Sequence, residues 1–444
     1  FYAHGYDYWS KQGINGPKPI PIFGNFLSTK FTVFVDDLEL TKYYSGRVPI
    51  LRISDPELIK VILIKDFHLF PNRSKLNMSN NAITSKNLKQ LTGDNWHRIR
   101  AIVSPVFSSG KMRKMKPRIV ECLGEVYTRL DESHLVNLLE ICRQFSMDAM
   151  ATSVFSIDIQ WGKFLDRVNN NGLPNFAKDG FRDPKATNFF VDSIRHIISQ
   201  RRQNPDLKHN DFIQQLMDAE IDTTNLGGTT TTVPGDISLP LSSSTLFVNR
   251  LLLYYRVPNV FLVATYGGTA LTLAFSLYEM AVNEDIQHRL YDELTEAIDS
   301  KTGEIPDHQL ARLPYLDAVI SETLRRYTAP VPLARYCTQD CKLGDTGIVI
   351  KAGQQIEIPV HAIHHSDLNY KDPFIYDPDR FMPDQKHLIR PYTYLPFGAG
   401  PRHCVGMRFA LFEIKLALAH IVLRYRFIRC PQTDVPIRYK KFIH

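Results

Sequence analysis

The positions of apolar and polar residues along the chain predict many helices and a few short strands. Apolar residues recur every three or four positions, as in helices with one buried face, over 93–107, 114–129, 134–155, 189–203, 210–220, 279–299, 307–327 and 406–423. Alternating residues predict a strand at 47–53, and a Gly-containing turn within 345–360 predicts a β-hairpin. Residues 160–188 and 225–244 are rich in turn-forming residues and are predicted to be loops. The pattern therefore predicts a mainly α protein with small β-sheets.

One helical segment is unusually apolar. Val257 to Tyr278 contains no charged residue over 22 positions, so by length alone it could span a bilayer. Because it also contains Pro258, Gly267 and Gly268, we interpret it as a long helix buried through the middle of a large domain.

The composition is typical of a globular protein. The chain has 444 residues, of which 44% are hydrophobic and 22% are charged, which excludes a disordered chain, a collagen and a coiled coil. A mean hydropathy of −0.20 excludes a polytopic membrane protein. The formal net charge of +7 allows attraction to an acidic partner or a lipid surface, but nucleic-acid binding would also need a clustering of these charges and is not expected.

The six cysteines indicate neither a disulfide framework nor a zinc site. They lie at positions 122, 142, 337, 341, 404 and 430, with no pair of CxxC motifs. Cys337 and Cys341 are four residues apart, and we interpret them as two ordinary thiols rather than as metal ligands. We expect a reducing compartment, in which thiols persist.

The candidate chemistry lies close to the C-terminus. A motif FxxGxRxCxG is formed there by Phe397, Gly400, Arg402, Cys404 and Gly406. A thiolate that binds iron needs a glycine-rich loop, because the backbone must approach closely and its N–H groups must point at the sulfur. For Cys404 alone, a thiol in a loop before a helix would be the simpler interpretation. The complete motif favours a metal ligand.

This motif resembles the fingerprint of the cytochrome P450 superfamily, and the resemblance covers essentially the whole chain. It implies the cytochrome P450 fold, with haem b between the long central helix and the helix that follows the Cys404 loop. It also implies that Cys404 ligates the iron, where an axial thiolate favours O–O cleavage. Arg402 is then expected to contact a haem propionate, and Phe397 and Gly406 are expected to lie against the cofactor.

Three further residues resemble haem-contacting positions of the family. Trp96 and Arg100 form a WxxxR motif, which places both side chains on one helix face. Arg335, which follows Pro330 and Pro332, matches another residue that contacts a propionate. The resemblance implies that all three bind the propionates; an amphipathic helix with a buried Trp is the alternative for the first two.

A second motif resembles a structural network of the family. Glu322 and Arg325 form an ExxR motif on one helix, and Arg380 follows in a PxRF segment. An ExxR alone is a weak signal, because most such pairs are surface salt bridges. The combination resembles the buried Glu–Arg–Arg triad that shapes the haem-binding side. His364 matches a family position before this segment, and a structural histidine is the alternative interpretation.

Several segments are most similar to the animal microsomal branch, with its vertebrate drug- and steroid-oxidising and insect detoxification members. Those proteins carry an N-terminal membrane helix. We therefore expect residues 1–25 to be a Pro-rich segment after such an anchor, and 26–444 to be a single catalytic haem-thiolate domain at the cytosolic face of the endoplasmic reticulum membrane. The stretch from Trp161 to Phe190 is much shorter than in relatives, where this region forms the roof of the substrate pocket.

The central helix departs from the family pattern. Residues 264–269 align with the family's Ala-Gly-x-Glu/Asp-Thr-Thr motif, whose acid and alcohol relay protons to bound dioxygen. Gly267 and Gly268 occupy the acid and alcohol positions, while Ala264 and Thr269 lie at the ends of the motif. We assign these four residues to the catalytic position and expect poor proton delivery there.

The resemblance implies a haem-dependent monooxygenase acting on an apolar substrate such as a sterol, fatty acid or xenobiotic. Its electrons would come from NADPH through NADPH-cytochrome P450 reductase, with cytochrome b5 as a further partner. A basic run fits an acidic partner but also a solvated helix start; it comprises Lys111, Arg113, Lys114, Lys116 and Arg118. Two alternatives stay open: a haem-thiolate isomerase or dehydratase acting on a lipid peroxide, and a non-catalytic haem- or ligand-binding protein.

Overall fold

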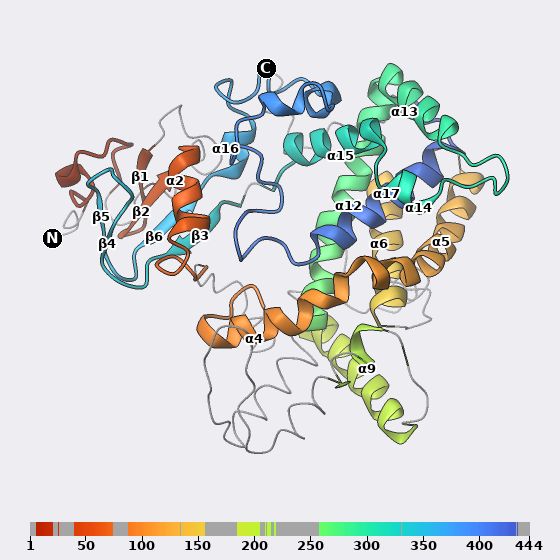
Figure 1. Ribbon diagram of the computed structural model, residues 1–444, viewed down its shortest axis with the longest axis horizontal. Coiled ribbons are helices and arrows are strands. Elements are labelled where there is room, and N and C mark those ends of the chain that lie inside the picture. The colour runs from red at the N-terminus through yellow and green to blue at the C-terminus, as the bar shows by residue number, and fades with distance from the viewer. Residues whose placement is uncertain are drawn as a thin grey trace. The chain divides into compact units, whose positions relative to one another are not determined.

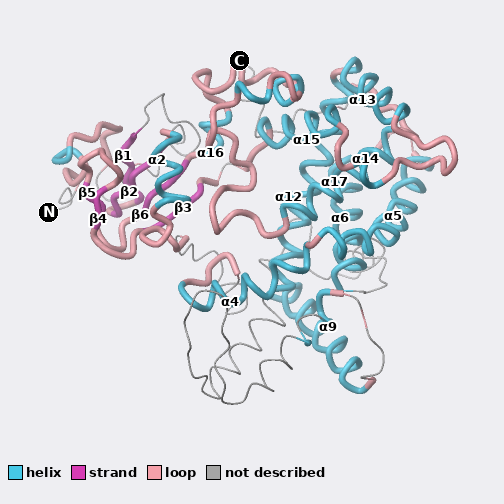
Figure 2. Tube along the Cα trace, in the orientation of Figure 1, coloured by secondary structure: helices cyan, strands magenta, loops and turns pink. Residues whose placement is uncertain are grey.

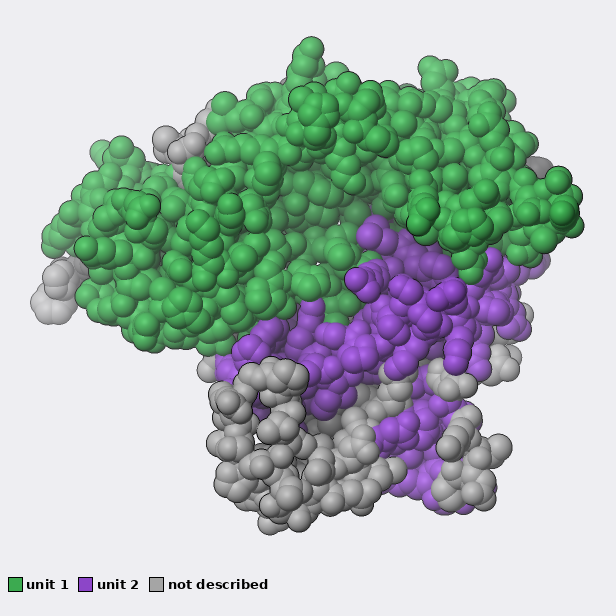
Figure 3. All heavy atoms as spheres, in the orientation of Figure 1, with its two compact units in different colours: residues 1–75, 275–407, 414–444 green, residues 76–274, 408–413 purple. Residues whose placement is uncertain are grey.

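A computed structural model describes residues 6–20, 25, 40–73, 88–133, 135–155, 184–204, 209, 211–214, 217–218, 257–329, 331–431 and 433. The chain divides into two compact units, which Figure 3 colours separately. Unit 1 comprises Phe1–Lys75, Phe275–Met407 and Ile414–His444, and unit 2 comprises Leu76–Ala274 and Arg408–Glu413. The expected division into a segment 1–25 and one catalytic domain stays a prediction.

Helices dominate the described residues, which confirms the mainly α prediction (Figure 1). Those of unit 1, with 3₁₀ and π turns written as η, are η1 (Ser10–Gln12), α2 (Pro56–Lys60), η2 (Val61–Lys65), α13 (Glu284–Glu296), α14 (Asp307–Leu310), α15 (Pro314–Arg326), α16 (Val360–His364), η6 (Pro378–Phe381) and η7 (Lys386–Leu388). Those of unit 2 are α4 (Gly93–Val103), η3 (Ser104–Phe107), α5 (Ser109–Glu132), α6 (Leu138–Phe155) and α9 (Pro184–Gln203). Two helices have residues in both units: α12 (Val257–Val282) and α17 (Met407–Val422).

The strands gather in one part of unit 1, as Figure 2 shows. A four-stranded sheet has the order β1 (Leu40–Ser45), β2 (Val48–Ile53), β6 (Gln355–Ile358) and β3 (Leu333–Tyr336). β2 is antiparallel to β1 and parallel to β6, and β3 is antiparallel to β6. A separate pair is formed by β4 (Cys341–Lys342) and β5 (Val349–Ile350). The predicted strand at 47–53 is confirmed by β2.

The predicted hairpin over 345–360 is wrong, because its two halves belong to different sheets. β5 pairs with β4, whereas β6 pairs with β2 and β3. Gly353, with φ of +77°, makes the turn between them and directs the chain into the four-stranded sheet. Ile356 and Ile358 are fully buried there, so burial of β6 outweighs local pairing with the preceding strand.

The core of unit 1 joins the N-terminal segment to the sheet. Trp9 is fully buried and belongs to the same apolar cluster as Tyr44 and Leu51 of the first two strands. Helix α2 adds Ile59 to this cluster. It begins after Asp55, whose carboxylate accepts a hydrogen bond from the Leu58 backbone N–H at 2.7 Å, the usual capping contact at a helix start.

Two predicted helices are interrupted in the structure. A helix within 279–299 is confirmed by α13, but its start differs. α12 ends at Val282 and α13 starts at Glu284, with Asn283 between them outside the helical backbone region. The helix predicted over 307–327 is confirmed by α14 and α15, but it is not continuous, because the short α14 ends before Pro314. Pro314 lacks an N–H donor and is favoured in the first turn of a helix, and here it starts α15.

Other boundaries also differ from the sequence pattern. Helix α9 begins at Pro184, inside the stretch predicted to be a loop over 160–188. The rest of that stretch up to residue 183, and the predicted loop at 225–244, lie outside the described residues. Only short helical pieces of the predicted segment 210–220 are described, at 212–214 and 217–218.

The long helix expected over 257–278 is confirmed by α12. Where its side chains are described, Leu273, Leu277 and Met280 are buried. Among the described helices, none has the length and apolar character required to cross a membrane.

Candidate functional site

The loop before α17 presents the Cys404 thiol at an exposed position. Two backbone hydrogen bonds fold the loop: Cys404 N–H donates to the Phe397 carbonyl at 2.9 Å, and His403 N–H donates to the Gly400 carbonyl at 3.0 Å. Phe397 and Gly406, predicted cofactor contacts, flank this loop and are partly buried. The motif therefore forms one closed loop with an accessible sulfur.

Gly400 brings this loop into close contact with η2. Its φ is +71°, and a Cβ atom there would lie 1.9 Å from the Leu63 carbonyl oxygen, a distance that excludes any side chain. Gly398 has the same φ, but its Cβ would lie 3.6 Å from the nearest atom, in Leu333. At Gly406 a Cβ would have no atom within 4 Å in the part of the chain that the structure describes, so packing there does not require glycine.

Three arginines of unit 1 cluster beside this loop. Arg335 on β3 and Arg402 are 2% and 3% exposed. Arg73 donates from Nη2 to the Arg402 carbonyl at 2.6 Å. Burial, followed by the charges of Arg73 and Arg402, lowers the pKa of Arg335 to about 9. The cluster therefore concentrates positive charge in a poorly solvated place.

The Arg335 side chain is poorly satisfied within the described residues. Its Nη1 donates to the Ala334 carbonyl at 2.9 Å, while its buried Nε has no hydrogen-bond partner there. A buried guanidinium in this state is costly unless an anion compensates it. The cluster thus fits a bound group with carboxylates.

The predicted WxxxR residues lie in unit 2. Trp96 is buried on α4, and Arg100, one turn later, is partly buried on the same helix. Their spacing puts both on one face, as expected. Their assignment to the propionates stays a prediction.

The aligned catalytic residues all lie in α12. Thr269 is buried, whereas Gly268 is exposed and Gly267 is partly buried. A Cβ atom at either glycine would meet no atom of the described residues within 4 Å, so these residues leave room for side chains at both positions. Thr272 Oγ1 donates to the Gly268 carbonyl at 2.9 Å, and Ala264 lies one turn before these residues.

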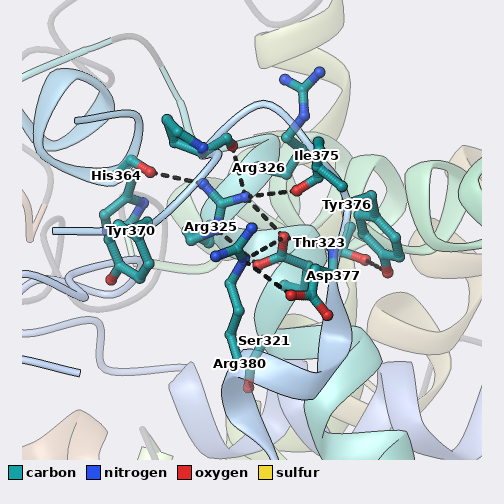
Figure 4. A network of polar contacts seen from close by, with 12 residues as sticks. Ser321, Thr323, Arg325, Arg326, His364, Tyr370, Ile375, Tyr376, Asp377 and Arg380 are labelled. Carbon is teal, nitrogen blue, oxygen red and sulfur yellow. Dashed lines mark hydrogen bonds and ion pairs between the residues drawn. The ribbon is translucent and has the colours of Figure 1, made fainter. Parts of the chain in front are cut away.

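The predicted Glu–Arg–Arg network is confirmed in unit 1 (Figure 4). Arg325 donates from Nε and Nη2 to the two carboxylate oxygens of Glu322, both at 2.7 Å, and neither side chain is exposed. Arg380 Nε lies 3.6 Å from Glu322 Oε1. Burial raises the pKa of Glu322, and Arg325 opposes that shift.

Arg325 also binds three backbone carbonyls. It donates to His364 at 2.7 Å, to Pro373 at 2.8 Å and to Ile375 at 3.4 Å. The Asp377 N–H donates to Glu322 Oε1 at 2.9 Å. The network therefore joins α15 to α16 and to the chain leading into η6.

His364 has a structural position. Its Nε2 accepts a hydrogen bond from the Leu395 N–H at 2.9 Å, and burial lowers its pKa to about 3. The neutral ring thus links α16 to the segment around Leu395 that leads into the Cys404 loop. This geometry supports the structural interpretation of His364.

Comparison with known proteins identifies the class. The sequence model of the cytochrome P450 family matches residues 14–172 and 256–443, so the chain belongs to the cytochrome P450 family. It is 30% identical over 480 residues to cytochrome P450 3A11 of Mus musculus, covering 98% of this chain and 90% of that protein. It is 29% identical over 479 residues to cytochrome P450 6k1 of Blattella germanica, again covering 98% and 90%.

The chain is therefore a microsomal-type cytochrome P450, similar to insect and vertebrate members, and an oxidoreductase of the monooxygenase class. Its cofactor is haem b, and its electrons come from NADPH indirectly through a reductase. The side chains of unit 1 fit this cofactor: an exposed thiol suits the iron, and the arginine cluster suits the two propionates.

Sequence reasoning missed Arg73. It belongs to no motif, and only the fold brings it to Arg402, 329 positions along the chain. The contact of Gly400 with Leu63 was missed for the same reason, because spacing within one loop carries no information about the opposing segment.

Proposed function

We propose that this protein inserts one oxygen atom of dioxygen into an apolar substrate such as a sterol, fatty acid or xenobiotic. The observation that carries the proposal is the closed loop with the exposed Cys404 thiol beside the buried arginine cluster. Bound haem would supply the iron that activates dioxygen, and the Cys404 thiolate would donate electron density to that iron.

The chain's own residues would hold the cofactor. Cys404 would bind the iron as a thiolate, and Arg335 and Arg402 would bind the propionates through charge-assisted hydrogen bonds. Arg73, through its bond to the Arg402 carbonyl, would fix the backbone from which Arg402 projects. Trp96 and Arg100 are further candidates from the family motif.

The partners we propose are NADPH-cytochrome P450 reductase and cytochrome b5, on the cytosolic face of the endoplasmic reticulum membrane. On α5, Arg113, Lys114 and Arg118 are exposed, while Met112 and Met115 on the other side of the helix are buried. A basic face of this kind suits an acidic protein surface and raises association rates at low salt.

Gly267 and Gly268 favour a second candidate, a haem-thiolate isomerase or dehydratase acting on a lipid peroxide. Neither glycine offers an acid or a hydroxyl for proton transfer. Such a reaction needs no external electrons. The absence of an acid and a hydroxyl at these two positions would therefore matter less for it.

One pair of assays separates the two candidates. The haem-loaded protein is incubated with lipid substrates, either with NADPH and reductase or with a lipid hydroperoxide alone. Product only in the first assay supports the monooxygenase, and rearranged product only in the second supports the alternative. Cys404→Ala should abolish the ~450 nm band of the reduced carbon-monoxide complex; persistence of the band would contradict thiolate ligation by Cys404.

A further inference from the structure

Cys337 and Cys341 form a close pair at the turn between β3 and β4. Their Sγ atoms lie 3.3 Å apart. Cys337 is fully buried in the core of unit 1, and Cys341 is partly buried against it. In a disulfide the sulfurs are about 2.05 Å apart, so they would need to approach by only about 1.3 Å.

The turn that carries the pair is held from several sides. Cys337 exchanges backbone hydrogen bonds with the β6 side of the chain, donating to Gln354 at 2.9 Å and accepting from Gly353 at 2.8 Å. Between the two cysteines, Asp340 pairs with Lys351 at 2.7 Å and accepts the Ala352 N–H at 2.9 Å. The backbone therefore fixes both Cα positions, and thiol rotation is the main movement that bond formation requires.

A metal site is not supported by the surroundings. Within the part of the chain that the structure describes, no group of three or more His, Cys, Asp or Glu side chains could hold a metal ion. Two sulfurs without further ligands suit covalent chemistry between them better than coordination.

We propose that Cys337 and Cys341 are a redox-active dithiol that forms an intrachain disulfide with a small-molecule disulfide such as oxidised glutathione. The Cys341 thiolate, the more accessible of the two, attacks one glutathione sulfur and releases one glutathione thiolate. The Cys337 thiolate then attacks the Cys341 sulfur of the mixed disulfide and releases the second glutathione. Both protein thiols lose their protons, two electrons pass to the glutathione disulfide, and two glutathione thiols result.

The exchange is slow at neutral pH. Burial, the neighbouring Cys337 and the carboxylates of Asp66 and Asp340 raise the pKa of Cys341 to about 12. Only the thiolate attacks a disulfide. At pH values below this pKa, the exchange rate should therefore rise roughly tenfold for each unit by which the pH increases. The Cys337–Cys341 disulfide would link the end of β3, two residues after Arg335, covalently to the start of β4.

The test uses the haem-loaded protein and glutathione buffers from fully reduced to fully oxidised. After quenching, the thiols are alkylated in denaturant and the peptides are analysed by mass spectrometry. Oxidation should remove both alkylation sites from the peptide with Cys337 and Cys341, leaving it two hydrogens lighter and without glutathione. Alkylation of both residues in oxidised glutathione at pH 8.5 would overturn the proposal, as would a disulfide from either residue to Cys430.

Single variants separate the two steps. Cys337→Ser should stop at a stable glutathione adduct on Cys341, and Cys341→Ser should leave Cys337 alkylatable. The partly buried Cys430 gives a matched control, because Cys430→Ser should leave the disulfide yield unchanged. Should Cys337→Ser fail to fold, Cys341→Ser and the wild-type protein still decide, because equal oxidation of Cys337 in both would contradict the pairing.

Discussion

Among single residues, Gly400 controls how closely the Cys404 loop can approach η2. Gly400→Ala would add a Cβ atom 1.9 Å from the Leu63 carbonyl oxygen, at a φ of +71°. Left-handed backbone strain and overpacking together should lower the free energy of unfolding by about 2–5 kcal/mol. Urea unfolding of the purified protein measures this loss.

Gly398 provides the matched control for that prediction. Its φ is also +71°, but its added Cβ would meet ordinary contact distances. Gly398→Ala should therefore cost only the backbone strain, about 1–2 kcal/mol. Equal losses in the two variants would show that the contact with Leu63 is not limiting.

We predict that Arg335 lowers the stability of the cofactor-free protein and strengthens cofactor binding. Arg335→Gln removes a buried guanidinium. The pKa of this group is lowered by burial and by two neighbouring arginines. Replacing it should leave the cofactor-free protein equally or more stable, because an uncompensated buried cation is lost. The same change should reduce the haem-to-protein ratio after purification.

The exposed Arg390 is the control for this change. Arg390→Gln should alter neither the urea midpoint of the cofactor-free protein nor the haem content. If Arg335→Gln lowered both, its role would be general packing rather than anion binding.

At the scale of elements, the Glu322 network joins α15 to α16 and η6. Glu322→Ala should leave Arg325 buried without its carboxylate, at a cost of roughly 3–5 kcal/mol. We expect the variant to lose haem during purification, as measured by the absorbance ratio of haem to protein. Asp377→Asn changes a carboxylate at the 42% exposed edge of the network and should retain haem; stable haem-loaded protein with Glu322→Ala would contradict the prediction.

The two glycines of α12, Gly267 and Gly268, should limit how much product forms per NADPH consumed. On the proposed monooxygenase function, Gly267→Glu with Gly268→Thr supplies an acid and an alcohol where the structure leaves room for side chains. The product formed per NADPH consumed should rise, because the introduced carboxyl and hydroxyl groups would donate protons at positions where the two glycines offer none. The double variant Gly267→Ala with Gly268→Ala controls for helix propensity, and tight coupling in the unmodified protein would show that another proton path exists.

The elements also show what a sequence pattern can and cannot predict. The helix over 257–278 and the Glu322–Arg325 pair were predicted correctly, because periodicity and i, i+3 spacing are local properties. The breaks at Asn283 and Pro314 were missed because the apolar spacing continues across them. The pairing of β6 with β2 and the approach of Arg73 to Arg402 depend on residues hundreds of positions apart, which no local pattern specifies.

At the scale of the whole molecule, three buried histidines should make stability depend on pH. Burial lowers the pKa of His361, His364 and His365 to about 4, 3 and 2. In the unfolded chain the same groups titrate near about 6.5, so below that pH the unfolded state binds more protons. Stability should therefore fall as pH drops from about 6.5 towards 4, by about 1.4 kcal/mol per pH unit for each histidine.

Urea unfolding between pH 7.5 and 4.5 measures that slope. His365→Gln should reduce it by the share of one histidine, whereas substitution of the exposed His387 with Gln should leave it unchanged. A slope that is identical in all three proteins would assign the acid sensitivity to other groups.

The parallel pairing of β2 with β6 has a consequence for synthesis on the ribosome. Arg52 and Glu357 form a buried ion pair at 3.1 Å across these strands, 305 positions apart in the chain. At elongation rates of about 5–20 residues per second, β6 is synthesised roughly 15–60 seconds after β2. During that time its open edge is exposed to other nascent chains, so the yield of this protein in a cell should depend on chaperones that act before translation ends.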